Sequence, residues 1–288
     1  MQKRTLAIHD ISCFGRCSLT VALPILSAAG IETPVIPTAI LSTHTGGFTD
    51  FTFRDLSEDI IPILNHWVSL DLRFDSIYSG YLGSVSQIDI LISASSMLRN
   101  KNNKKPLVFV DPVMADHGSL YKSFPESFPL EMKRLCQHAD IIVPNITEAC
   151  FLTNTPYEEG PYTKDYIHKL IFELKTLGTK QIVITGIYFN DKQIGAVSYD
   201  CESDNINYHF TDKINGSYHG TGDIFSSVLL SGILNNFSLS DSVDFAAQFT
   251  YSAIARTIGN IEDTRFGVNF EEGLYELASK FQKPSLIK

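Results

Sequence analysis

A glycine-rich turn in front of an apolar helix is the strongest chemical signal in the sequence. The segment His219-Gly220-Thr221-Gly222-Asp223 is followed at once by IFSSVLLSGIL. Two glycines let backbone N–H groups approach an anion, and a helix that begins here directs the positive end of its dipole at the same point. That dipole also favours an ionised Asp223, so a phosphate and a carboxylate able to accept a proton would lie together. A tight turn with an acidic residue that stabilises the helix start explains the segment equally well.

A second carboxylate follows an aliphatic run that predicts a strand, Leu107–Val110. Asp111 comes directly after it and is fixed by Pro112, in the segment DPVMAD. A carboxylate at a strand's carboxyl end is well placed to hold Mg²⁺ through water in a nucleotide site. Taken alone, however, a turn residue held by the following proline is the better interpretation.

A third candidate follows the aliphatic run Ile141–Val143. Asn145 and Glu148 are separated by three residues in the segment PNITE, so on a helix both side chains could point toward one site. An N-cap asparagine with a glutamate at the third helical position fits the same residues structurally.

The three segments together are more informative than any one of them. The chain has neither the GxxxxGK[ST] pattern nor a GxGxxG pattern. Carboxylates after several strands, combined with a glycine-rich anion site, therefore indicate phosphoryl transfer outside the P-loop and dinucleotide-binding classes.

Alternating strands and helices must position these residues. Short aliphatic runs without polar alternation are typical of strands buried on both faces of a parallel sheet, and they occur at Leu6–Ile8, Val35–Leu41, Ser76–Ser79, Leu107–Val110, Ile141–Val143 and Ile182–Thr185. Helical spacing covers approximately 18–30, 55–69, 87–99, 129–138, 164–177, 221–234, 239–257 and 270–281. The runs Gly195–Tyr199 and Asn207–Phe210 indicate a hairpin at a sheet edge.

This order predicts one α/β domain over residues 1–288, with helices on both faces of a mostly parallel sheet. Ligands bind beyond the carboxyl ends of the strands in such sheets, where the candidate residues stand. No linker, repeat or low-complexity tract divides the chain.

Composition excludes several other classes. Apolar residues make up 44% and charged residues 19% of the 288 residues, which excludes disorder and a coiled coil. A net charge of -9 without any basic run argues against a nucleic-acid partner. Five scattered cysteines and no apolar segment of membrane-spanning length lead us to expect a soluble, cytoplasmic protein with reduced thiols and no membrane partner.

The arrangement resembles the ribokinase-like superfamily and, within it, the pyridoxal (vitamin B6) kinases. The matching segments occur in the family's order over nearly the whole chain: the Gly15 loop, LSTHT ending at Thr45, SGYLGS from Ser79, DPVM at Asp111, PNITEA at Asn145, and GTGD. The superfamily shares GTGD, whereas THT and SGYLGS indicate the B6 branch. The resemblance implies a three-layer α/β/α sandwich with an antiparallel hairpin at one edge and no large lid domain.

The resemblance also implies an activity, the ATP-dependent phosphorylation of the 5'-hydroxymethyl group of pyridoxal, pyridoxine or pyridoxamine. Asp223 would be the catalytic base, and Gly220, Thr221 and Gly222 would form the anion hole. The residues implied for ATP are Asp111, Asn145, Glu148, Thr185, Gly186 and Tyr121, with Asp111 and Glu148 organising Mg²⁺ largely through water. A monovalent cation such as K⁺ and a homodimer are further family features.

On the acceptor side the resemblance implies a B6 pocket. Asp10, Thr45 and Tyr81 match positions that line it, with Tyr81 over the pyridine ring and Cys17 on the opposite face. Asp10 stands where the related kinases usually carry serine. A carboxylate there could favour a cationic ring nitrogen or the amine of pyridoxamine, so the preference among the three vitamers stays open. Ala115 replaces a glycine that often follows DPVM.

Two alternative functions remain open from the sequence. Hydroxymethylpyrimidine (phosphate) kinase shares the fold and the chemistry, although its N-terminal loop is usually Ser/Gly-rich, unlike HDISCFGRCSL. A non-catalytic sensor of vitamers or nucleotides is the alternative from another class, and the intact Asp223, Gly220, Gly222 and Asp111 argue against it.

Overall fold

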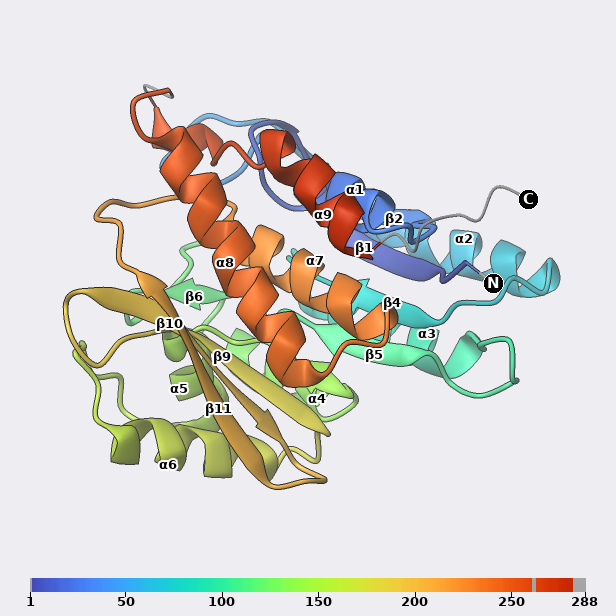
Figure 1. Ribbon diagram of the computed structural model, residues 1–288. Coiled ribbons are helices and arrows are strands. Elements are labelled where there is room, and N and C mark those ends of the chain that lie inside the picture. The colour runs from blue at the N-terminus through green and yellow to red at the C-terminus, as the bar shows by residue number, and fades with distance from the viewer. Residues whose placement is uncertain (1, 261–262, 282–288) are drawn as a thin grey trace, which may run out of the picture.

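The computed structural model describes residues 2–260 and 263–281, and within them the chain forms a nine-stranded sheet between two helical layers (Figure 1). The strands lie in the order β11-β10-β9-β8-β5-β4-β1-β2-β3. This is the three-layer architecture that the sequence predicts.

The centre of the sheet is parallel and its edges are antiparallel. The parallel strands of the described chain are β2 (Val35–Thr43), β1 (Thr5–Phe14), β4 (Ser76–Ser79), β5 (Leu107–Val110), β8 (Ile141–Ile142) and β9 (Gln181–Ile187). The antiparallel strands are β3 (Phe53–Asp55) at one edge, and β10 (Gln193–Asp200) with β11 (Asn205–Asp212) at the other. The predicted edge hairpin is therefore confirmed.

One helical layer covers each face of the sheet. On one face lie α2 (Ser57–Ser69), α3 (Val85–Met97), α4 (Phe128–Cys136), α5 (Ile146–Thr153) and α6 (Lys164–Lys175). On the other lie α1 (Leu19–Ala28), α7 (Thr221–Leu234), α8 (Leu239–Thr257) and α9 (Leu274–Phe281), preceded by the short 3-10 helices η1 (Thr264–Phe266) and η2 (Glu271–Gly273). Each layer buries its apolar side chains against the strands, which gives the molecule two hydrophobic cores.

The sequence order of the strands reverses at β1. The chain moves from β1 outward to β2, then returns to β4 on the other side of β1 and continues outward to β5, β8 and β9. In open α/β sheets, a ligand binds beyond the carboxyl ends of the strands at such a switch point. The candidate residues at this end of the sheet are therefore in the expected place.

Strand β1 is longer than the run Leu6–Ile8 predicts, because it continues past the end of β4. β4 pairs with β1 only between Thr5 and Ile8, whereas β2 accompanies β1 as far as Phe14. Asp10 consequently lies in the part of β1 beyond the end of β4, at the register shift in the pairing of β1 with β2.

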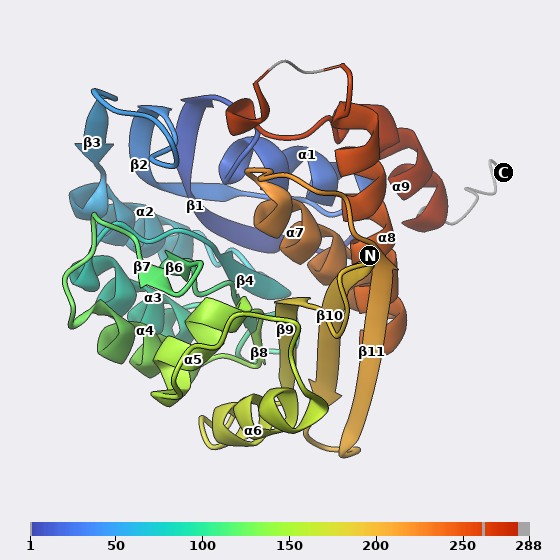
Figure 2. The ribbon, with the colours of Figure 1, turned by 90° about the vertical axis from the view of Figure 1, so that its left-hand side faces the viewer.

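Two short pieces of β structure have no signal in the sequence. β3 spans three residues whose side chains are all exposed, so no apolar alternation marks it. The hairpin of β6 (Ala115–Asp116) and β7 (Ser119–Leu120) follows directly after Asp111, at the same end of the sheet as the start of α7 (Figure 2). Both are formed by backbone pairing between segments too short to carry a periodic pattern.

None of the helices in the described ranges has the length and apolar character needed to cross a membrane.

Candidate active site

A cavity of about 600 Å³ opens beyond the carboxyl ends of the central strands. Its walls include all the residues that the sequence assigns to catalysis, ATP and metal, namely Asp111, Tyr121, Asn145, Glu148, Thr185, Gly186, Gly220, Thr221, Gly222 and Asp223. A cavity of this volume is in the range of small-molecule and nucleotide sites. The structure thus brings together the segments that the sequence leaves ambiguous one by one.

Asp223 lies in the first turn of α7, at the wall of this cavity. Its Oδ2 accepts a hydrogen bond of 2.8 Å from the backbone N–H of Ser18, in the loop between β1 and α1. Burial raises the pKa of Asp223 to about 7, and the nearby charges of Asp111 and Asp10 act in the same direction. Burial thus opposes the helix dipole, which favours the ionised form of Asp223. A carboxyl group that titrates near neutral pH is suited to proton transfer.

Gly220 occupies the N-cap position of α7 in a left-handed conformation, with φ 75°. A Cβ atom at this position would lie only 1.9 Å from the carbonyl oxygen of Arg16. The glycine is thus required twice, for its backbone conformation and for the close approach of the β1–α1 loop. This contact packs the glycine-rich turn against the β1–α1 loop, whose Ser18 N–H binds Asp223.

Asp111 and Glu148 form a buried pair of carboxylates behind the turn. Asp111 Oδ2 accepts a hydrogen bond of 2.8 Å from Ser226 Oγ of α7. Glu148 accepts from the backbone N–H groups of Asn145 (2.9 Å) and Met114 (3.1 Å). Burial raises the pKa of Asp111 to about 7, and burial together with the charge of Asp111 raises the pKa of Glu148. Two adjacent carboxylates that repel each other in a desolvated place are a suitable setting for a cation.

The chemistry of this pair fits Mg²⁺. Carboxylate oxygens are the ligands that this ion prefers, and Mg²⁺ is usually bound by one or two carboxylates, with water and substrate phosphates as the other ligands. In the described residues, no cluster of three or more His, Cys, Asp or Glu side chains is arranged to hold a metal by itself. The site therefore fits a cation that arrives with a phosphate ligand rather than a closed structural metal centre.

Asn145 is confirmed as the N-cap of α5, in a capping box with Glu148. Its Oδ1 accepts from Glu148 N at 2.9 Å, and its Nδ2 donates to the carbonyl of Ala115 at 2.8 Å. The structural and the functional interpretations of this segment are thus compatible, since the capping box places Glu148 beside Asp111. The bond to Ala115 also ties α5 to the β6–β7 hairpin.

The other cavity residues lie around this centre. Thr185 pairs with Asn145 through an isolated parallel bridge, and Gly186 follows it with φ 75°. Burial raises the pKa of Tyr121, and the charges of Glu148 and Asp116 add to the shift, so its hydroxyl stays protonated and can donate.

The residues assigned to the acceptor are not among the residues that line the cavity. Asp10 is buried, its Oδ2 accepts from Ser12 Oγ at 2.9 Å, and burial raises its pKa. Cys17 is buried too, and its pKa is raised by burial and by the charges of Asp223 and Asp10, so it remains a thiol. The charge of Asp10 also contributes to the raised pKa of Tyr81, after burial. The effect of Asp10 on the pKa of both groups indicates that Cys17 and Tyr81 lie near this carboxyl group.

Thr45 is placed in the loop that follows β2, next to His44 and Gly46. Within the described residues, the side chain of Thr45 makes no hydrogen bond to the acceptor-side carboxylates. The structure therefore leaves its assignment untested.

Several residues that line the cavity are not identified as site residues from the sequence. Ser226 is three positions after Asp223 on α7, so the helical spacing could have indicated it. Ala247, Thr250, Tyr251 and Ile254 of α8 line the cavity at helical spacing, which a search for a second face on α8 could have found. Lys213 also lines it, with its ammonium 4.1 Å from the ring centroid of Tyr188. No local signal marks Lys213, since its cation–π partner Tyr188 lies far from it in the sequence.

The cavity has an acidic wall for a site of phosphate chemistry. Its carboxylates are Asp111, Asp116, Glu148, Glu159, Asp212 and Asp223, and among the described lining residues only Lys213 carries a fixed positive charge. An anionic ligand must therefore be held chiefly by backbone N–H groups, the start of α7 and a bound cation.

The comparisons with known proteins agree with this geometry. A family model described as phosphomethylpyrimidine kinase matches residues 23–267. A protein from Bacteroides thetaiotaomicron, provisionally named a phosphomethylpyrimidine kinase, is 34% identical to this chain, with a TM-score of 0.90. The match covers 96% of each chain, and the crystal form compared contains pyridoxal. The pyridoxal kinase from Lactobacillus plantarum is 31% identical with a TM-score of 0.88, over 97% of this chain and 98% of that one. The pyridoxal kinase of Dictyostelium discoideum is 28% identical over 96% of this chain and 93% of its own length.

Proposed function

We propose that this chain, which belongs to the phosphomethylpyrimidine kinase family and to the pyridoxal kinases within it, transfers the γ-phosphoryl group of ATP to a vitamin B6 vitamer. The acceptor is the 5'-hydroxymethyl group of pyridoxal, pyridoxamine or pyridoxine, and the product is the 5'-phosphate. The observation that carries the proposal is the position of Asp223, which lines a cavity of nucleotide size and also lies close to the buried side chains of Asp10 and Cys17.

The named relatives support this acceptor. Two of them are pyridoxal kinases, and the Bacteroides protein was crystallised with pyridoxal. The sequence segments THT and SGYLGS support the same branch.

In the proposed mechanism, Asp223 accepts the proton of the acceptor hydroxyl as that oxygen attacks the γ-phosphorus. The bond between the γ-phosphorus and the bridging oxygen of the β-phosphate breaks, and ADP leaves. The transition state of phosphoryl transfer is loose, so position and neutralisation of charge matter more than a strong base. The backbone N–H groups of Gly220, Thr221 and Gly222, at the start of α7, stabilise the charge on the transferred group. Ser18 N–H keeps the carboxylate of Asp223 oriented through the 2.8 Å hydrogen bond.

On the donor side, we assign ATP to the cavity, with Asn145, Thr185, Gly186 and Tyr121 as its contacts. Asp111 and Glu148 would hold Mg²⁺, which neutralises phosphate charge when it is bound. The charge of such an ion would offset the repulsion from Asp111, which together with burial raises the pKa of Glu148.

We further propose that residues 1–288 act as one kinase domain, that K⁺ or a similar ion assists, and that the protein is a cytoplasmic homodimer. Residues 1, 261–262 and 282–288 of that domain lie outside the described residues. Phe14, Ile40 and Phe53, large apolar side chains exposed on β1, β2 and β3, support a contact at this edge of the sheet.

The test is ATP-dependent phosphorylation of pyridoxal, pyridoxine, pyridoxamine and hydroxymethylpyrimidine by purified protein with Mg²⁺. Turnover of a B6 vitamer is expected. A comparison of the rates in K⁺ and Na⁺ tests whether a monovalent cation assists. The mass of the same sample, measured by light scattering, tests whether the protein is a dimer. Hydroxymethylpyrimidine (phosphate) kinase is the second candidate, because the names of the family model and of the Bacteroides protein refer to a phosphomethylpyrimidine kinase. Turnover of the pyrimidine alone would establish it, and binding of a vitamer without turnover would instead indicate a sensor.

A change at Asp111 tests the metal assignment. Asp111→Asn keeps an oxygen that can accept from Ser226 but removes one of the two carboxylates. We expect the Mg²⁺ concentration for half-maximal activity to rise by about tenfold or more. Asp116→Asn is the matched control, since Asp116 lines the same cavity but is exposed. An unchanged Mg²⁺ dependence in Asp111→Asn would contradict the assignment.

A change at Asp10 tests vitamer preference. A buried carboxylate favours an acceptor with a cationic nitrogen, so Asp10→Ser should lower kcat/KM for pyridoxamine relative to pyridoxal by about tenfold, or about 1.4 kcal/mol. Ser12→Ala is the control, because it removes the hydrogen bond to Asp10 and keeps the charge. Equal ratios in the wild type and Asp10→Ser would exclude a role in selectivity.

A further inference from the structure

The loop between β1 and α1, Gly15–Ser18, forms a wall of the site and has a strained backbone. Ser18 adopts φ 51° and ψ -130°, in a region that residues other than glycine rarely occupy, and it makes no side-chain cap to α1. From this conformation its N–H donates to Asp223. Strained conformations persist only where the surrounding structure over-determines them, so the loop requires support from outside.

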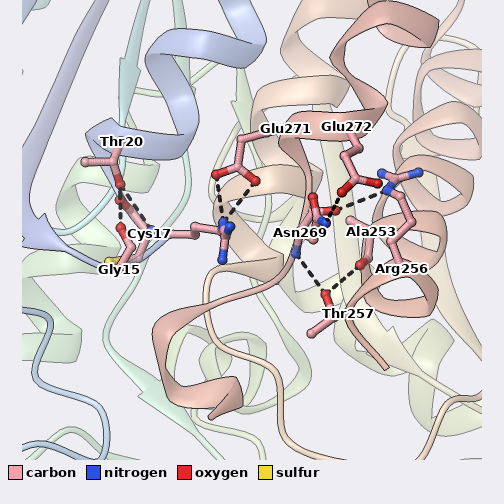
Figure 3. Close-up of polar contacts among 10 residues, drawn as sticks. Gly15, Cys17, Thr20, Ala253, Arg256, Thr257, Asn269, Glu271 and Glu272 are labelled. Atoms are coloured by element: carbon pink, nitrogen blue, oxygen red, sulfur yellow. Dashed lines mark hydrogen bonds and ion pairs between the residues drawn. The ribbon is translucent and has the colours of Figure 1, made fainter. Parts of the chain in front are cut away.

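That support comes from the segment Asp263–Gly273, which we call the strap. The N–H of Arg16 donates to the carbonyl of Phe266 at 2.8 Å, and a Cβ on Gly267 would lie 2.6 Å from the Arg16 carbonyl oxygen. The guanidinium Nε of Arg16 lies 2.7 and 2.9 Å from the two carboxylate oxygens of Glu271. Figure 3 shows Glu271 on the side of the strap that faces the loop of Gly15 and Cys17. Arg16 is thus held between the strap on one side and Gly220 on the other.

The strap is itself fixed to α8. Arg256 Nε donates to the carbonyl of Asn269 at 3.1 Å, and Asn269 N donates to Thr257 Oγ1 at 2.8 Å (Figure 3). Asn269 Nδ2 donates to Glu272 Oε1 at 2.8 Å, next to the residue that pairs with Arg16. Val268 and Phe270 between these contacts are buried in the core. The strap can therefore serve as a rigid support for the loop.

The strap also contacts the loop that follows β2. His44 Nδ1 accepts from Gly46 N, so its Nε2 carries the proton and donates to the carbonyl of Arg265 at 2.6 Å. The side chain of Arg265 donates to the carbonyl of Gly47 at 3.1 Å and lies 4.9 Å from the ring centroid of Phe48. The β1–α1 loop and the loop that follows β2 therefore both contact the strap.

We propose that the Arg16–Glu271 ion pair is a positioning device for phosphoryl transfer, which holds the β1–α1 loop against the start of α7 so that Ser18 N–H orients Asp223. This inference rests on the proposed function. Arg16 and Glu271 act through the backbone of Ser18 and Gly220 and touch no reacting atom themselves. An ion pair whose side chains are 33% and 46% exposed adds little to global stability, so its main effect is local.

The test compares Arg16→Gln, Glu271→Gln and the exchanged pair Arg16→Glu with Glu271→Arg. We expect each single variant to lose about tenfold in kcat, with KM for ATP and Tm close to the wild type. The exchanged pair should recover most of the loss. Arg134→Gln is the matched control, because Arg134 pairs with Asp89 at 3.0 Å on the distant surface of α4 and α3, and it should behave as the wild type.

The pH dependence of kcat supplies a readout that a structural role would not move. The bond from Ser18 lowers the pKa of Asp223, so loss of the bond should move the acidic limb of the profile to higher pH. The titratable groups that face Asp223 are Asp10 from β1, Cys17 from the loop, Tyr78 from β4, Asp111 after β5, and Tyr121 after β7. None of these groups is changed in the variants. An unshifted profile would overturn the proposal.

Amide hydrogen exchange of residues 14–20 separates this inference from the proposed function, since it needs no turnover. Protection should fall in Arg16→Gln, and also in Gly267→Ala, which disturbs the contact between the strap and the backbone of Arg16 without a change of charge. Equal protection in the wild type and both variants would overturn the positioning role. A wild-type protein that phosphorylates no vitamer would overturn the proposed function, while the exchange result would still decide whether the ion pair holds the loop.

Discussion

Replacing Asp223 by asparagine should lower kcat for vitamer phosphorylation by about 10³-fold, within the usual range for a lost general base. Asparagine has nearly the same size, and its Oδ1 can still accept the hydrogen bond from Ser18 N–H. The loss would therefore come from the missing proton acceptor rather than from a displaced loop. The measurement is steady-state kinetics with the preferred vitamer, together with the Kd for ATP, which should stay close to the wild-type value.

The pH profile gives a second measure of the same residue. Proton acceptance requires the ionised carboxylate, and the pKa of Asp223 is raised to about 7, so kcat/KM of the wild type should rise with pH through this region. The residual activity of Asp223→Asn should lack that limb. Asp212→Asn is the control, since Asp212 lines the same cavity on β11 and is exposed. A variant at Asp223 that retained a tenth of the activity would refute its role as the base.

Gly220→Ala should have the second largest effect. The new methyl group would lie 1.9 Å from the Arg16 carbonyl oxygen, and φ 75° is unfavourable for alanine. Either the β1–α1 loop or the start of α7 must move, and both hold catalytic groups. We expect kcat to fall by about 10²-fold or more, as for other damaged oxyanion sites, and stability to fall by about 1–3 kcal/mol.

Gly222→Ala provides the comparison within the same turn. A Cβ on Gly222 meets no heavy atom within 4 Å, and its backbone is not left-handed. Its free energy of unfolding should therefore stay within about 0.5 kcal/mol of the wild type. Denaturant unfolding of both variants measures the difference, and equal stabilities would contradict the close contact between Gly220 and the loop.

The convergence of Asp111, Asn145, Glu148 and the turn at Gly220 on one cavity could be predicted from the sequence because the signals are local. Asp111 follows a buried strand, and Asn145 with Glu148 forms a capping box within four residues, so each motif determines its own geometry. Parallel strands then bring their carboxyl ends to one edge, which assembles the motifs without further information. The helix start at Gly220 is marked in the same local way.

The remaining features depend on contacts that no short window of sequence contains. Ser18 and Asp223 are 205 residues apart, and Arg16 and Glu271 are 255 apart. Beyond Ile8, β1 pairs with β2 but no longer with β4. The polar residues His9 and Asp10 interrupt the aliphatic run there, so the sequence does not indicate that the strand continues. The raised pKa of Asp223 likewise results from burial by several distant segments, which the helix-dipole argument does not include.

The pairing of the first and last parts of the chain has a consequence during synthesis. α1 packs against α9, and the two helices lie side by side in Figure 1 although they are near opposite ends of the sequence. A ribosome completes Gly15–Ser18 and the turn at Gly220 well before it reaches Glu271, since translation proceeds from the N-terminus. A nascent chain can thus contain every proposed reacting group and still lack the segment that holds them in register. In this protein, competence for phosphoryl transfer would be acquired late, when the C-terminal residues leave the ribosome.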